Sequence, residues 1–250
     1  MLFLSQNIVA NAVPIELKRL MQSYPSEIKS VTDKKIIWQD NSQFHVENHS
    51  NLFKHFFTAK PVDQISLKDL QCDSYENVFK KMYGATPQAV QKHLTTMYWM
   101  PGIFGNKYPI RVTTVNGVDK KLASISQKLE KLSPKYYKYL ENLGGAFYWR
   151  TVKNERYLSA HSFGIALDLN TKYGDYWLWD FKKTKAKTFS LKVNNRLPQV
   201  IVDIFEQAGF LWGGRWAFYD TMHFEYRPEL FKQANNTMIY NHELGERCLI

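Results

Sequence analysis

Two short stretches of the 250-residue chain contain residue types that can bind a metal ion and activate water. The first holds His161 and Asp168, seven residues apart with Gly164 between them. Asp168 lies in an otherwise apolar run, and a buried carboxylate requires a compensating cation or a hydrogen-bond network. The second stretch holds Asp220 and His223. Two imidazoles and one carboxylate are the minimum set for a catalytic zinc site, in which three protein ligands leave the fourth position to water.

Hydrolysis by a metal-activated water also needs a base that takes the proton of the water. Asp220, three residues before His223, is the candidate if the intervening turn folds it back toward the metal. Glu225 is the competitor, because a strand would place it on the same face as His223. The spacing alone leaves the simpler interpretation open, in which the histidines are hydrogen-bonded and Asp168 caps a turn.

A cation near such a site helps to hold a substrate carboxylate or the oxyanion of a tetrahedral intermediate. Arg150 follows the apolar run 146–149 and is the candidate for this role, with Arg156 in reserve. The alternative is that Arg150 pairs with a nearby carboxylate or stacks on Trp149.

The pattern around these residues predicts strands at 165–169 and 222–226, with His223 and Glu225 on one strand face. The run after Leu143-Gly144-Gly145 predicts a further strand that ends at Arg150. Apolar residues at helical spacing over 197–208 predict a helix that Gly209 ends.

The first half of the chain predicts a helix after Pro14, a strand over 35–38 and a helix that begins at Thr86-Pro87. Asn116-Gly117 predicts a β-hairpin. An amphipathic helix is expected over 122–132. This irregular alternation predicts an α+β protein with a small antiparallel sheet and flanking helices.

The expected organisation has four parts. Residues 1–12 fit a signal-peptide remnant as well as they fit an ordinary N-terminus. Residues 13–120 form an N-terminal region without an assigned role, residues 121–232 form the catalytic core, and residues 233–250 form a polar tail.

Composition limits the partners. The net charge of +10 favours an anionic partner, but the chain has no nucleic-acid motif and no long basic run, so no nucleic-acid partner is expected. No apolar run reaches the ~20 residues of a membrane span. Cys72 and Cys248 form no CxxC pair, which excludes a cysteine metal site; whether the two residues pair, and the oligomeric state, stay open.

A two-part motif resembles the zinc-dependent D-alanyl-D-alanine carboxypeptidase family, which is VanY-like and related to phage L-alanyl-D-glutamate endopeptidases. The motif reads Ser159-x-His161-x-x-Gly164-x-Ala166-x-Asp168, followed by Asp220-x-x-His223-Phe224-Glu225. The resemblance is clearest over residues 144–228. It implies the fold that this family shares with the Hedgehog signalling domain.

The resemblance implies that His161, Asp168 and His223 bind one Zn²⁺ per chain. It implies further that Asp220 acts as general base and then as acid toward the leaving amine.

The resemblance also implies that Arg150 polarises the scissile carbonyl and that Ser159 contacts the substrate. Arg150 lies closer to His161 in sequence than the corresponding arginine does in many phage members.

The function implied is hydrolysis of peptidoglycan stem peptides, as a D-alanyl-D-alanine carboxypeptidase in the periplasm or outside the cell. Three alternatives stay open. The first is an L-alanyl-D-glutamate-type endopeptidase, and the second is a non-catalytic wall-binding module on the same fold. The third is a non-haem iron oxygenase, because two histidines and a carboxylate also suit iron.

Overall fold

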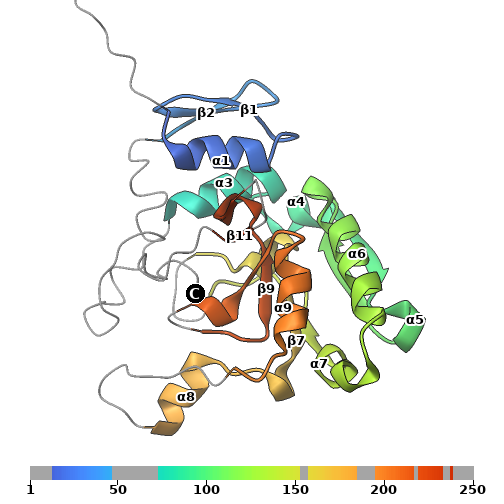
Figure 1. Cartoon of the computed structure of the whole chain (residues 1–250). Coiled ribbons are helices and arrows are strands. Elements are labelled where there is room, and N and C mark those ends of the chain that lie inside the picture. Colours follow the sequence, from blue (N-terminus) through green and yellow to red (C-terminus); the bar gives the residue numbers. More distant parts are fainter. Residues whose placement is uncertain are drawn as a thin grey trace, which may run out of the picture.

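The computed structural model describes residues 13–46, 73–152, 157–184, 195–216, 219–232 and 237–238. Helices and short antiparallel sheets alternate along the chain, which confirms the predicted α+β class (Figure 1). The expectations for residues 1–12, Cys72, Arg156 and Cys248 fall outside the described residues.

A four-stranded antiparallel sheet forms the centre of the molecule. Its strand order is β6 (Leu143–Gly145), β7 (Ala166–Asn170), β9 (His223–Tyr226) and β8 (Phe210–Trp212). The strands predicted at 165–169 and 222–226 are therefore confirmed as β7 and β9. These two strands lie side by side in the sheet, although more than 50 residues separate them in sequence. Their pairing is what brings the two candidate stretches together.

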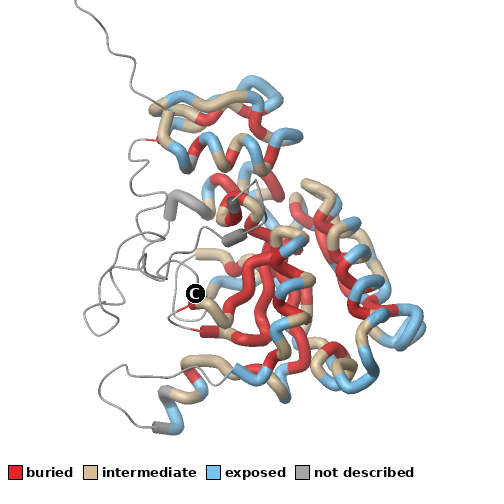
Figure 2. The backbone as a smooth tube through the Cα atoms, in the orientation of Figure 1, coloured by how far each residue is buried: buried red, intermediate tan, exposed pale blue. Residues whose placement is uncertain are grey.

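Helix α9 (Gln199–Glu206) lies against the central sheet, and helix α6 (Val118–Glu130) lies beside α9 (Figures 1 and 2). Helix α9 confirms the prediction for 197–208, and its Phe205 ring stacks on Phe224 of β9 with 4.0 Å between centroids. Helix α6 buries the apolar stripe predicted from its sequence. Burying such a stripe is the main driving force for holding an amphipathic helix in place.

The hairpin predicted at Asn116-Gly117 is wrong. Both residues adopt the left-handed backbone that such a turn requires, with φ of 57° and 66°. They lie in a 3₁₀ helix (Val115–Gly117) that leads directly into α6, so no second strand follows. The helical apolar stripe of α6 decides the outcome, because only a helix buries it.

The strand that precedes Asn116-Gly117 pairs with a strand from earlier in the chain. Strand β5 (Pro109–Thr113) forms an antiparallel ribbon with β4 (Leu94–Tyr98), and the short helices α4 (Pro87–Gln91) and α5 (Pro101–Phe104) flank β4. The predicted helix start is confirmed, since the Thr86 side chain caps α4.

The strand predicted to run up to Arg150 is also wrong. Strand β6 occupies the glycine-rich residues 143–145, and residues 146–150 continue without regular strand structure. Their backbone instead follows β5 and the turn that carries His161, through Phe147 N–H to Arg111 O and Tyr148 N–H to His161 O.

The N-terminal part packs on the same core. Helix α1 (Ile15–Ser23) and a three-stranded antiparallel sheet of β1 (Ile28–Val31), β2 (Lys35–Trp38) and β3 (Gln43–His45) share a continuous apolar cluster with the central sheet. Helix α3 (Asp73–Tyr83) lies between α1 and the central sheet (Figure 1). Tyr24, just after α1, packs edge-on against Tyr226 at the end of β9.

The remaining elements are short. They comprise α7 (Tyr137–Leu140), α8 (Trp177–Thr184), and β10 (Phe231–Lys232) paired with β11 (Thr237–Met238). In the predicted tail, the described residues 237–238 form the short strand β11. Among the described residues, no helix is long and apolar enough to span a membrane.

Candidate metal centre

His161 lies in a tight turn whose backbone is fixed by the residues at its start and at its end. A 3₁₀ helix (Ala160–Phe163) carries it, and the Ser159 hydroxyl accepts a hydrogen bond from the His161 N–H at 3.4 Å. Gly164 ends the turn with φ of +68°, and a Cβ there would lie 2.6 Å from the Leu94 side chain. Only glycine fits this combination of backbone and contact, which lets the chain reverse and enter β7.

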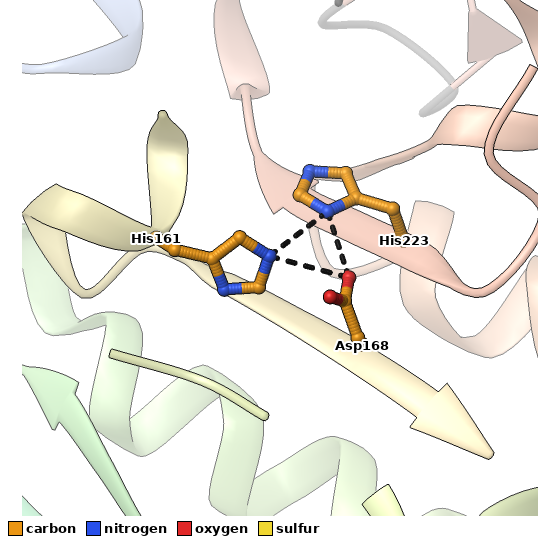
Figure 3. A group of neighbouring side chains, drawn as sticks. All are labelled: His161, Asp168 and His223. Atoms are coloured by element: carbon orange, nitrogen blue, oxygen red, sulfur yellow. Dashed lines mark hydrogen bonds and ion pairs between the residues drawn. The ribbon is translucent and has the colours of Figure 1, made fainter. Parts of the chain in front are cut away.

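Strand pairing brings the other two residues to His161. Asp168 of β7 and His223 of β9 are direct partners in the antiparallel register. Figure 3 shows the three side chains converging: His161 Nε2 lies 3.2 Å from both Asp168 Oδ1 and His223 Nδ1, and His223 Nδ1 lies 2.9 Å from Asp168 Oδ1. Tetrahedral zinc with bonds of ~2.0–2.1 Å sets its ligand atoms roughly 3.3 Å apart. The three residues therefore fit one metal ion, and their role as zinc ligands stays a prediction.

The outer ring nitrogens of both histidines are also held. His161 Nδ1 lies 2.5 Å from the carbonyl oxygen of Ala146, which only accepts hydrogen bonds, so Nδ1 carries the proton. His223 Nε2 donates to Glu225 Oε2 at 3.2 Å. Each contact leaves the inward-facing nitrogen available as a ligand, an arrangement typical of metal-binding histidines.

This geometry rules out Glu225 as the competing base. Its carboxylate binds the ring nitrogen of His223 that points away from Asp168 and His161. The prediction placed Glu225 on the correct strand face, but the imidazole ring stands between its carboxylate and the three ligand atoms.

The charges of the site are strongly coupled. Burial disfavours charge on both Asp168 and His223, but hydrogen bonds and the attraction between opposite charges outweigh it. The pKa of His223 is raised to about 10 by Asp168 and Glu225, and the pKa of Asp168 is lowered by His161 first and by His223 second. Without a metal ion, His223 therefore carries a proton, and its positive charge compensates the carboxylates of Asp168 and Glu225.

Asp220 lies at the edge of this cluster. Its backbone carbonyl accepts from His223 N–H at 3.2 Å, so the residue folds back over the start of β9. Burial and the negative charge of Asp168 raise the pKa of the Asp220 carboxyl to about 7, although the histidines oppose this. Its Oδ1 atom is buried and has no hydrogen-bond partner in the part of the chain that the structure describes. A buried acceptor without a partner is costly and is typical of a site that receives a ligand or water.

Arg150 and Ser159 flank the His161 turn through their backbones. Arg150 N–H donates to Ser162 Oγ at 2.9 Å, and Ser159 N–H donates to Arg150 O at 3.0 Å. The Arg150 side chain is exposed. Burial and the charge of Asp220 raise the pKa of Tyr176, whose backbone pairs with Asp220, and the charge of Arg150 opposes this rise. Ser159 is buried with its hydroxyl on the turn. Contact of either residue with substrate stays a prediction.

Sequence reasoning missed three features. Trp216 packs its ring 5.2 Å from that of His223, and its indole N–H is buried without a hydrogen-bond partner among the described residues. Tyr176 faces the charges of both Asp220 and Arg150. Arg227 continues a buried ionic chain from Glu225, for which the only sequence signal is the alternation of charged residues along Glu225-Tyr226-Arg227.

Comparison with known proteins supports the family that the motif indicated. Residues 152–226 match the family described as D-alanyl-D-alanine carboxypeptidase. The match covers the 3₁₀ helix of His161 together with β7, α8, α9, β8 and β9, and so includes every predicted metal ligand. The predicted family is thereby confirmed over this segment. No curated protein and no solved structure matches the chain.

Proposed function

We propose that this protein is a zinc-dependent hydrolase of peptidoglycan stem peptides that removes the terminal residue of D-alanyl-D-alanine. The observation that carries the proposal is the convergence of His161, Asp168 and His223 on one point, with the second carboxylate of Asp220 beside it. The family match over the same residues supports the substrate class.

Zinc is the metal that this ligand set suits best. Two neutral imidazoles and one carboxylate leave a fourth position for water, and bound zinc lowers the pKa of that water to roughly 7. No thiolate competes for the ion within the described residues around the site.

Asp220 supplies the acid–base chemistry. Its raised pKa keeps the carboxyl near the midpoint of its titration at neutral pH, where a general base is most effective. It would accept the proton of the attacking water and return it to the leaving amine. Its buried Oδ1 atom, without a partner among the described residues, offers the acceptor that this step needs.

Arg150 and Ser159 would act on the substrate. The exposed guanidinium of Arg150 forms no hydrogen bond or ion pair with any residue in the described ranges, so it is available to a substrate carbonyl or carboxylate. We assign Ser159 a place at the substrate because it begins the turn that carries His161. The net charge of +10 suits an anionic cell wall, which would place the protein in the periplasm or outside the cell.

The second candidate is an endopeptidase that cuts within the stem peptide with the same centre. The third, a non-catalytic wall-binding module, has no chemical need for the buried carboxyl of Asp220. An iron oxygenase would use the same ligands, and metal analysis separates it from the other three.

Defined stem peptides test the proposal. We expect the zinc-loaded protein to release free D-alanine from a pentapeptide that ends in D-alanyl-D-alanine, as followed by mass spectrometry. Cleavage at an internal bond would select the endopeptidase instead. Full activity in a His223→Ala variant, or no cleavage of any stem peptide by the zinc-loaded protein, would contradict it.

A further inference from the structure

A continuous chain of buried polar contacts begins at His223 and leads away from the metal centre. His223 Nε2 contacts Glu225 Oε2 at 3.2 Å, and Glu225 Oε1 accepts from Arg227 Nη1 at 2.9 Å. Arg227 Nε then donates to Glu229 Oε1 at 2.6 Å. The last contact runs from the Tyr24 hydroxyl to Glu229 Oε2 at 2.6 Å. Each carboxylate thus uses one oxygen toward each neighbour.

Every member of this relay, defined as Glu225, Arg227, Glu229 and Tyr24, is at least nine-tenths buried. Charged groups this deep are strongly held by their partners, because losing one partner leaves an uncompensated buried charge. Arg227 is packed further by the Phe79 ring, 5.1 Å from its guanidinium carbon. The relay is therefore a fixed part of the fold.

The relay ends outside the segment that matches the family. Arg227 and Glu229 follow residue 226, and Tyr24 lies 205 positions from Glu229, directly after α1. The N-terminal helix, whose role the sequence left open, is thus connected to a metal ligand through four hydrogen bonds.

The charges of the relay indicate whether its loss should raise or lower metal affinity. Among the described residues, the ligands and the relay contain three carboxylates, Asp168, Glu225 and Glu229, against the single guanidinium of Arg227. With both histidines neutral, the cluster carries an excess of two negative charges, and a divalent cation balances it. Weakening the relay should therefore weaken binding of the metal.

We infer that Glu225 is a positioning residue for His223 and that the relay couples metal affinity to the docking of α1 through Tyr24. This inference rests on the proposed zinc centre. Glu225 fixes the ring so that Nδ1 faces Asp168 and His161, and Arg227 and Glu229 fix Glu225 in turn. The Tyr24 hydroxyl, just after α1, donates to Glu229 and so joins α1 to the relay.

Zinc affinity of the full chain, measured by competition with a chromogenic chelator, tests the inference without reference to peptide hydrolysis. We expect Glu225→Ala to weaken zinc binding 10- to 100-fold, the usual effect of removing the partner of a metal-bound histidine. Glu225→Gln should lose less zinc affinity than Glu225→Ala, because the amide oxygen of glutamine still accepts a hydrogen bond from His223 Nε2. Tyr24→Phe should weaken binding about threefold. Tyr137→Phe, which removes a phenol that donates to the backbone oxygen of Glu130, should leave the affinity unchanged.

The double variant Tyr24→Phe/Glu225→Ala tests the coupling itself. If the relay transmits the effect of Tyr24, this variant binds zinc as Glu225→Ala does, because the connection is already broken. Independent, multiplicative losses would overturn the relay, and so would wild-type affinity in Glu225→Ala or no zinc binding by the wild type. If Glu225→Ala does not fold, Glu225→Gln replaces it in the same comparison. Normal coupling with no stem-peptide cleavage would contradict the proposed function alone.

Discussion

The two histidines of the metal centre are held in different ways. His161 sits on a 3₁₀ turn, and the carbonyl of Ala146, a backbone group, fixes its ring. His223 sits on a central strand, and a carboxylate that continues into a buried ionic chain fixes its ring. One ligand depends on local backbone geometry, and the other depends on residues from both ends of the chain.

This difference determines what disturbs each ligand. The His161 side is sensitive to the backbone of its turn, above all at Gly164. The His223 side is sensitive to charge, because Asp168 and Glu225 both contact the His223 ring and Glu225 also contacts the guanidinium of Arg227. A metal ion bound at the proposed centre would join the two sides, so its loss would affect both.

Replacing each histidine by alanine gives the largest effects. Both variants should lose bound zinc and at least about 10³-fold in peptide hydrolysis, since the activated water depends on the metal. Without metal, His223→Ala should cost about 3–5 kcal/mol of unfolding free energy, because two buried carboxylates, Asp168 and Glu225, each lose a contact. His161→Ala should cost only about 1–2 kcal/mol. Urea unfolding of both variants, after a chelator has removed the zinc, measures the difference. Equal losses of unfolding free energy would remove the distinction between the two sides.

Asp220→Asn separates chemistry from metal binding. The variant should keep its zinc and lose about 10²–10⁴-fold in turnover, since the amide cannot take a proton. Turnover and metal content of the same sample check this expectation. Unchanged turnover would exclude Asp220 as the base, whereas loss of the metal would assign it a ligand's role.

Gly164→Ala addresses the His161 side alone. The added methyl group meets the Leu94 side chain at a left-handed backbone position, so we expect a loss of about 2–3 kcal/mol and weaker zinc binding. Gly105→Ala is the matched control, because its φ is also positive, at +57°, but nothing lies within 4 Å of the new Cβ. The control should lose about 1 kcal/mol and bind zinc normally. Thermal unfolding with and without zinc compares the two variants.

The pH dependence of stability concerns the His223 side. The pKa of Asp220 in the folded protein is about 7, above its ordinary value of 3.8, so the folded state holds its proton longer than the unfolded state does. The contribution of Asp220 to the stability of the zinc-free wild type therefore falls as pH rises from about 4 to 7. Relative to wild type, Asp220→Asn should gain about 1–4 kcal/mol at pH 8 and nothing at pH 3.5. A gain independent of pH would contradict the assignment.

The sequence predicted the site well where the signals were local. Gly164 between His161 and Asp168 indicated a reversal, and the apolar run around Asp168 indicated a buried strand. The period of two in β9 placed His223 and Glu225 on one face. These features depend on neighbouring residues, so periodicity and residue type describe them.

The sequence could not predict what depends on contacts across the chain. Asn116-Gly117 has hairpin chemistry, but the apolar stripe of the next 13 residues makes a helix of them. Glu225 looked like a base because strand periodicity does not reveal which ring nitrogen it meets. Tyr24 gave no signal at all, since its partner is 205 residues away.

Zinc K-edge absorption spectroscopy of the purified, zinc-loaded protein tests the central claim most directly. Convergence of His161, Asp168 and His223 predicts four-coordinate zinc with nitrogen and oxygen ligands at ~2.0–2.1 Å, including the outer-shell signature of two imidazoles. His223→Ala should lose this signature. A sulfur shell, six-coordinate zinc without imidazole, or an unchanged spectrum in His223→Ala would contradict the assignment of the metal centre.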